Sequence, residues 1–197
     1  MHAYPLRVRA LIGALIAAAL AATLSIGVAG SAQAASYYNI INTDTGRALE
    51  VSVDGKFKMA PPNPNNMLQQ FKRTNVTLHG NGQSEAIVDN RLLDCIRTQL
   101  NGPNPNLIGE PQLGICAPSD TRNRWRLKGG VATPNPGIPG TQMKNVKSGE
   151  YLAEQFCLFG CPALARPSLI DASLVESDPA QLGGFVKWQF KFATTAP

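Results

Sequence analysis

Apolar and polar side chains alternate in three separate stretches of the chain, each of which contains a large aromatic residue. In FVKWQFKF, residues 185–192, every second side chain from Val186 to Phe192 is apolar, and lysine or glutamine stands between them. RNRWRLK, residues 122–128, repeats the alternation around Trp125, and QQFK, residues 69–72, has Phe71 at the matching place. A period of two is typical of a half-buried β-strand. The pattern predicts three related strands whose rings share one core.

The remaining sequence has no long amphipathic helical pattern. Short alternating runs are separated by Gly, Pro, Asn and Asp, which favours an all-β domain.

Each predicted unit also has a recognisable beginning. NTDTGRAL (42–49) and NVKSGEYL (145–152) share Asn, Gly and Leu at identical spacing, as expected of a turn that needs a flexible glycine before an inward leucine. DNRLLD (89–94) is a shortened version without the glycine. We therefore expect three units, at about 37–79, 83–130 and 140–193, with closed threefold symmetry.

The N-terminus has the features of a secretory signal peptide. Arg7 and Arg9 precede an apolar run from Leu11 to Ala29, and small residues at an A-x-A site follow it. An uncleaved membrane anchor is the alternative. We expect residues 1–34 to be a signal peptide and the secreted chain, 35–197, to be one domain with no membrane span after cleavage. Its net charge is then +3, from 16 Lys and Arg against 13 Asp and Glu, which gives little reason to expect specific nucleic-acid binding.

All four cysteines lie in the part predicted to be exported, which predicts disulfide bonds. Of the three possible pairings we favour Cys95 with Cys116 and Cys157 with Cys161, because each pair lies within one unit. A metal site at Cys157 and Cys161 is disfavoured, because no histidine or acidic cluster is near them in sequence. We expect no metal and no cofactor.

Units that begin Asn-x-x-x-Gly-x-x-Leu and end Gln-x-Trp resemble the ricin B-type β-trefoil lectins. The endings stand here as Gln69-x-Phe71, Asn123-x-Trp125 and Val186-x-Trp188, and the resemblance covers Tyr37 to Phe192. It implies an all-β fold, a β-trefoil with three pseudo-repeats.

The cysteines carry a second, narrower resemblance. Cys116 stands nine residues before Trp125, where the family often has a cysteine, but Cys95 follows Leu93 by two residues instead of preceding the leucine. LDCIR (93–97) with the later Gly-Ile-Cys is similar to the binding subunits of cytolethal distending toxins.

The resemblance to the lectins also implies which residues would bind sugar: an acid just after each unit's leucine, an aromatic ring on the following hairpin, and an amide. Unit two supplies Asp94 and Asn123 but no aromatic residue between Cys95 and Cys116, and is our first choice. Unit one, our second, supplies Glu50, Phe57 and Gln69. Unit three has Ala153 in place of the acid, and the adjacent Glu154 would face the other way.

These residues also have ordinary structural interpretations. Asp94 is as well suited to capping a turn, and Asn123 and Gln69 to bonding the backbone. A stripe of basic residues has two interpretations: it is a solvated strand face, or it attracts acidic glycans, anionic cell-wall polymer or nucleic acid. The stripe consists of Arg122, Arg124, Arg126 and Lys128.

Enzyme chemistry has little support. His79 is the one histidine after residue 34, and no nucleophile motif accompanies it. We therefore expect a secreted, non-enzymatic protein that recognises a glycan or polysaccharide. The alternative is a trefoil that binds proteins, such as a toxin's cell-binding subunit or a protease inhibitor using the proline-rich loops 60–66 or 102–106. A hydrolase is the least favoured.

Overall fold

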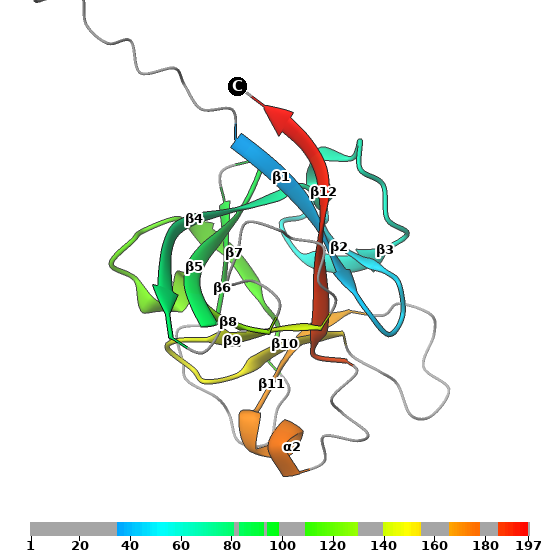
Figure 1. Ribbon diagram of the computed structural model, residues 1–197. Coiled ribbons are helices and arrows are strands. Elements are labelled where there is room, and N and C mark those ends of the chain that lie inside the picture. The colour runs from blue at the N-terminus through cyan, green and yellow to red at the C-terminus, as the bar shows by residue number, and fades with distance from the viewer. Residues whose placement is uncertain are drawn as a thin grey trace, which may run out of the picture. The chain divides into compact units, whose positions relative to one another are not determined.

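The computed structural model describes residues 35–80, 83–92, 94–98, 109–129, 140–154, 166–177 and 185–196. The predicted signal peptide, Leu93, the loop 102–106, and Cys157 with Cys161 lie outside these ranges. Nearly all regular structure in them is β-strand (Figure 1), and no described helix is long and apolar enough to span a membrane.

The strands are β1 (Ala35–Asn42), β2 (Ala48–Val51), β3 (Phe57–Ala60), β4 (Phe71–His79), β5 (Gln83–Asn90), β6 (Asp94–Arg97), β7 (Gln112–Ile115), β8 (Arg124–Lys128), β9 (Thr141–Asn145), β10 (Tyr151–Glu154), β11 (Pro167–Ile170) and β12 (Lys187–Ala196). The short helices are η1 (Met67–Gln69), η2 (Thr121–Asn123) and α2 (Ala172–Ser177).

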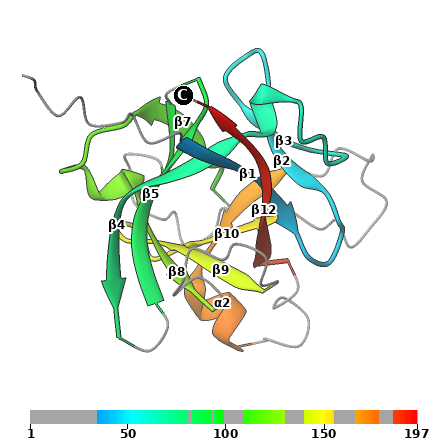
Figure 2. The ribbon, with the colours of Figure 1, turned by 45° about the horizontal axis from the view of Figure 1, so that its top comes forward.

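Six strands close a barrel. Antiparallel pairing joins β1 to β4, β4 to β5, β5 to β8, β8 to β9, β9 to β12, and β12 back to β1. The other six strands form three hairpins, β2–β3, β6–β7 and β10–β11. Strand, hairpin, strand therefore occurs three times along the chain, and the colours in Figure 2 follow the three units in order around the barrel.

The predicted aromatic residues fill the barrel. Phe71, Trp125 and Trp188 are fully buried in one cluster with residues from all three units, among them Leu49, Ile96 and Leu152. The expectation that these rings belong to the core is confirmed. Burial of rings of this size stabilises the fold by several kcal/mol each, on the order of 3–5.

The beginnings of the units follow the predicted pattern. Asn42, Asn90 and Asn145 end the first strand of their units and are almost fully buried. The side-chain oxygen of each accepts a backbone N–H from the turn that follows it, over about 3 Å. Gly46 and Gly149 adopt φ of 69° and 74° in the two longer turns, the conformation that favours glycine.

Two indole hydrogen bonds show which residues of the units are equivalent. Trp188 Nε1 donates to the carbonyl oxygen of Leu152 over 2.9 Å, and Trp125 Nε1 donates to that of Ile96 over 2.8 Å. Ile96 is therefore the inward residue of unit two, and Cys95 directly precedes it. The cysteine thus directly precedes the inward residue of its unit, as the resemblance to the trefoil lectins implies. The expected bond between Cys95 and Cys116 is present, with Cα atoms 5.1 Å apart.

Candidate functional site

Leu49, Ile96 and Leu152 occupy the same inward position in their three units. The residue of unit two that follows this position is therefore not the one expected from the sequence. That residue is Arg97, whereas units one and three have Glu50 and Ala153. Asp94 stands two residues before Ile96, at the place of Arg47 and Glu150 in the other units. The structure therefore does not place Asp94 where the acid of unit two was expected, because the shortened turn shifts the hairpin relative to the sequence match.

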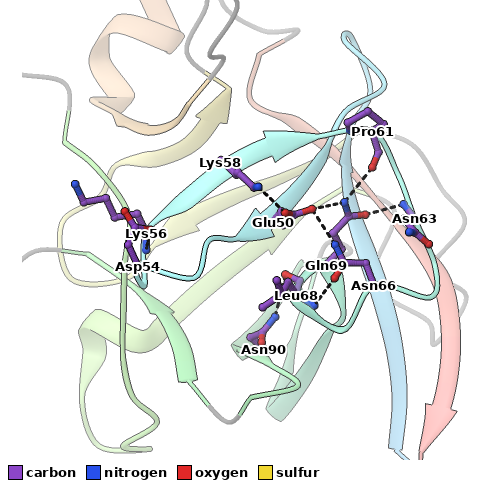
Figure 3. A network of polar contacts seen from close by, with 10 residues as sticks. All are labelled: Glu50, Asp54, Lys56, Lys58, Pro61, Asn63, Asn66, Leu68, Gln69 and Asn90. Carbon is purple, nitrogen blue, oxygen red and sulfur yellow. Dashed lines mark hydrogen bonds and ion pairs between the residues drawn. The ribbon is translucent and has the colours of Figure 1, made fainter.

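In unit one the expected acid and amide do meet. Glu50 lies on β2, opposite Lys58 of β3, and is nearly buried. Its Oε2 accepts hydrogen bonds from Gln69 Nε2 at 2.7 Å and from Asn66 Nδ2 at 3.0 Å. Its Oε1 lies 2.8 Å from the ammonium nitrogen of Lys58. Figure 3 shows the three donors converging on this one carboxylate.

The loop before η1 holds Gln69 in place. Asn66 caps η1 by accepting a hydrogen bond from the N–H of Leu68, and the side-chain oxygen of Gln69 accepts one from the N–H of Asn63. Gln69 also donates to the carbonyl oxygen of Pro61. The interpretation of Gln69 as a residue that bonds the backbone is confirmed, and the same amide also holds the carboxylate of Glu50. Its part in sugar binding stays a prediction.

Electrostatics keeps Glu50 ionised. Burial alone would raise the pKa of its carboxyl, but hydrogen bonds from Lys58, Gln69 and Asn66 and the charge of Lys58 outweigh it. The pKa of Glu50 is consequently below its usual value, and the group is an acceptor at neutral pH.

Phe57 does not join this cluster. It pairs with Val51, one position along the hairpin from Glu50 and Lys58, and so points to the opposite face, where it packs in the core. It also lines a pocket of about 270 Å³ together with residues at the starts of β7 and β11, among them Gln112 and Pro167. Phe57 therefore does not lie beside Glu50, and the side chain across from Glu50 is Lys58.

Unit two has different chemistry. Asn123 is fully buried and donates to the carbonyl oxygens of Ile115 and Ala117, its backbone-bonding role. Asp94 pairs across the hairpin with the highly exposed Ile115, and no hydrogen bond joins it to Asn123 in the described residues. Arg97 lies against Gly114. The two residues expected to form a sugar site in unit two therefore both adjoin Ile115, without a hydrogen bond between them among the described residues.

Unit three has Ala153 at the position of the acid and Val186 at the position of the amide. Ala153 lies opposite Ser168, while Glu154 faces the other way, as the alternation predicts. Glu154 accepts a hydrogen bond from Thr45 and lies 3.7 Å from a guanidinium nitrogen of Arg47, so it joins unit three to unit one. Burial raises the pKa of this carboxyl, against the opposing influence of Thr45 and Arg47.

Two contributors to the unit-one cluster were missed from the sequence. Lys58 and Asn66 do not belong to the sugar-binding pattern that the resemblance implied. Strand alternation places Lys58 beside Glu50 once the hairpin turn at 52–56 is recognised. Asn66 could have been found as the cap of a short turn three residues before Gln69.

No protein-family model and no curated protein sequence matches the chain. Solved structures do resemble it. A designed threefold-symmetric protein, ThreeFoil, superposes with a TM-score of 0.53 at 13% identity, over 80% of this chain and 98% of that one. The Haemophilus ducreyi cytolethal distending toxin gives 0.51 at 14%, over 81% and 83%. A Polyporus squamosus lectin, bound to a human-type influenza-binding epitope, gives 0.53 at 10%, over 81% of this chain and 50% of the lectin.

These likenesses establish the architecture. The chain has the β-trefoil fold, as its repeats predicted. At such identities the resemblance concerns the fold alone.

Proposed function

We propose that the protein is a secreted, non-enzymatic glycan-binding module, and that unit one holds its sugar site. The observation that carries the proposal is the ionised, oriented carboxylate of Glu50 beside the half-exposed ammonium group of Lys58. A carboxylate and an amine side by side match the donor and acceptor of a sugar diol.

The two carboxylate oxygens have different roles in this proposal. Oε2 is held by Gln69 and Asn66 and fixes the orientation of the group. Oε1 contacts Lys58, whose flexible side chain is half exposed and can turn aside. A sugar hydroxyl then donates to Oε1 and accepts from Lys58. Because the depressed pKa leaves Glu50 without a proton at neutral pH, it is unsuited to act as the general acid of a glycosidase.

A protein-binding module is the second candidate function, such as a toxin's cell-binding subunit or a protease inhibitor. One feature favours it: the exposed loop of residues 60–66 is held by several hydrogen bonds. Gln69 donates to Pro61, Gln70 donates to the carbonyl oxygen of Pro64 over 2.7 Å, and the N–H of Asn63 donates to Gln69. A rigid exposed loop loses little entropy on binding a partner.

A glycan array with wild type, Glu50→Gln and Asp94→Asn tests the sugar site. Both variants remove one negative charge at nearly constant size, so they are matched in charge and differ in unit. We expect Glu50→Gln to lose binding by about tenfold or more, as befits a charge-assisted hydrogen bond, and Asp94→Asn to retain it. Loss in Asp94→Asn alone would move the site to unit two. Folded protein that binds no glycan would favour the protein-binding function, and a protease inhibition panel would follow.

A further inference from the structure

A row of basic and amide side chains crosses five neighbouring strands on the outside of the barrel. The strand register pairs Lys187 of β12 with Gln142 of β9, and Gln142 with Lys128 of β8. It then pairs Lys128 with Gln83 of β5, and Gln83 with His79 of β4. We call this set, Lys187, Gln142, Lys128, Gln83 and His79, the Lys–Gln row. Its strands follow one another around the barrel in Figure 2.

The row is positive and contains no carboxylate, and its two lysines and His79 are exposed while its two glutamines are partly buried. Lys128 and Lys187 are exposed, and neither forms an ion pair with another described residue. Neighbouring strands lie about 4.8 Å apart, so cations on alternate strands are spaced about 10 Å along the row.

The adjoining positions add to the positive field. Arg126 and Arg124 share the same face of β8 and both contact Glu85 of β5. Glu85 also lies 3.6 Å from His79, so one carboxylate is shared by three basic groups. Lys144 adds little, because Glu176 lies 3.5 Å from it and Asp171 is also near. The surface as a whole keeps an excess of positive charge.

We infer that the Lys–Gln row binds a linear acidic polysaccharide, laid across the strands. Amides alternate with the lysines, so each lysine and its neighbouring glutamine offer a charge for a carboxylate or sulfate and a donor and acceptor for the hydroxyls beside it. This surface is separate from the Glu50 cluster and does not depend on it.

The face is less suited to a nucleic acid strand. Proteins that bind single strands stack bases on exposed aromatic rings. Trp125 of β8 and Trp188 of the adjoining part of β12 point into the barrel and are fully buried. Tyr151, beside Lys144, is also nearly buried. The exposed Phe192 lies near the other end of β12.

The test uses two double variants of the full chain with equal charge. Lys128→Gln with Lys187→Gln neutralises the row, and Lys56→Gln with Lys191→Gln removes two exposed lysines elsewhere, on the β2–β3 turn and farther along β12. Binding to polygalacturonate is measured against salt, with its methyl-esterified, uncharged form and oligo-dT as comparison ligands. Melting temperatures check that both variants fold, with the single Lys128→Gln variant in reserve.

We expect the row variant to weaken polygalacturonate binding about tenfold at low salt and to lower the salt slope of log Kd by about 2, one for each lysine. Two controls distinguish binding by the row from a general effect of net charge. The Lys56→Gln and Lys191→Gln variant should bind polygalacturonate like wild type, and the esterified polymer should bind neither wild type nor the variants. Equal loss in both double variants, or equal binding of the esterified polymer, would overturn the inference. Tighter binding of oligo-dT than of polygalacturonate would assign the row to nucleic acid instead. Binding of a neutral glycan through Glu50 should be unchanged in the row variant, so the two proposals fail independently.

Discussion

Trp125 and Ile96 are joined by an indole hydrogen bond of 2.8 Å that recurs between Trp188 and Leu152 at 2.9 Å. The ring of one strand thus bonds the backbone of its own unit's hairpin at the position of the inward residue. In unit one Phe71 occupies the ring position and has no N–H to donate. This relationship assigns Arg97 and not Asp94 to the position of Glu50, and it is the reason that unit one is the strongest candidate site.

Replacing Trp125 with Phe should destabilise the fold by about 2–3 kcal/mol, since it leaves a cavity and removes the bond to Ile96. The fold should survive, because Phe71 fills the same place in unit one. Chemical denaturation measures the change. A loss below about 0.5 kcal/mol would mean that the core repacks around the smaller ring.

The fold was largely predictable from the sequence, because it rests on strong local signals. Alternation around Phe71, Trp125 and Trp188, together with the Asn and Gly turns, identified the trefoil. The cysteine pair of unit two followed from its place within one repeat. Each of these signals comes from residues whose burial or backbone conformation has few alternatives.

The site was less predictable, because it depends on register. DNRLLD contains two leucines, and matching Leu93 to Leu49 moved the hairpin of unit two by three positions. The contact of Ile96 with Trp125, distant in sequence, and the pairing of Cys95 with Asp89 correct this. The position of Phe57 relative to Glu50 was not predicted for a related reason: it is adjacent to Lys58 in sequence, but a shift of one residue turns a strand side chain to the other face.

Gly149→Ala should cost about 1 kcal/mol, because its φ of 74° is unfavourable for a residue with a Cβ atom. Steric conflict contributes little, since an added Cβ would meet only the end of Lys144, at 4.0 Å. Thermal denaturation measures the effect. Gly80→Ala is the matched control: Gly80 has no positive φ and open space around it, so its variant should be neutral or slightly more stable. Equal losses in both would contradict the backbone explanation.

Removing the bond between Cys95 and Cys116 with the pair of changes Cys95→Ala and Cys116→Ala should cost about 3 kcal/mol. The bond closes a loop with a sequence separation of 21, and it restricts the unfolded chain accordingly. Because Cys95 is fully buried, reductant should also act slowly on the native protein. Urea denaturation of the variant and thiol trapping during reduction measure the two effects. Rapid reduction without unfolding would show that the β6–β7 hairpin opens locally.

Asp89 should make the protein less stable at neutral pH than at mildly acid pH. Burial raises the pKa of its carboxyl from 3.8 to about 6, although Lys72 lies 3.6 Å away and opposes the shift. No hydrogen bond from another residue reaches its other, buried oxygen within the part of the chain that the structure describes. The native state therefore holds the proton more tightly than the unfolded chain. Asp89 imposes no cost below about pH 4, and its cost grows to about 3 kcal/mol above pH 6.

Asp89→Asn should accordingly raise the melting temperature at pH 7 and change it little at pH 4, with part of the gain lost because Lys72 is left unpaired. Asp120→Asn is a control of opposite sign. Its hydrogen bonds from Arg122 lower the pKa of Asp120, so that carboxylate stabilises the fold above its unfolded pKa and the variant should lose stability at pH 7. Melting curves from pH 4 to 7.5 for both variants decide the matter. If Asp89→Asn also lost stability at pH 7, attraction between Asp89 and Lys72 would have to exceed the cost of burying the charge.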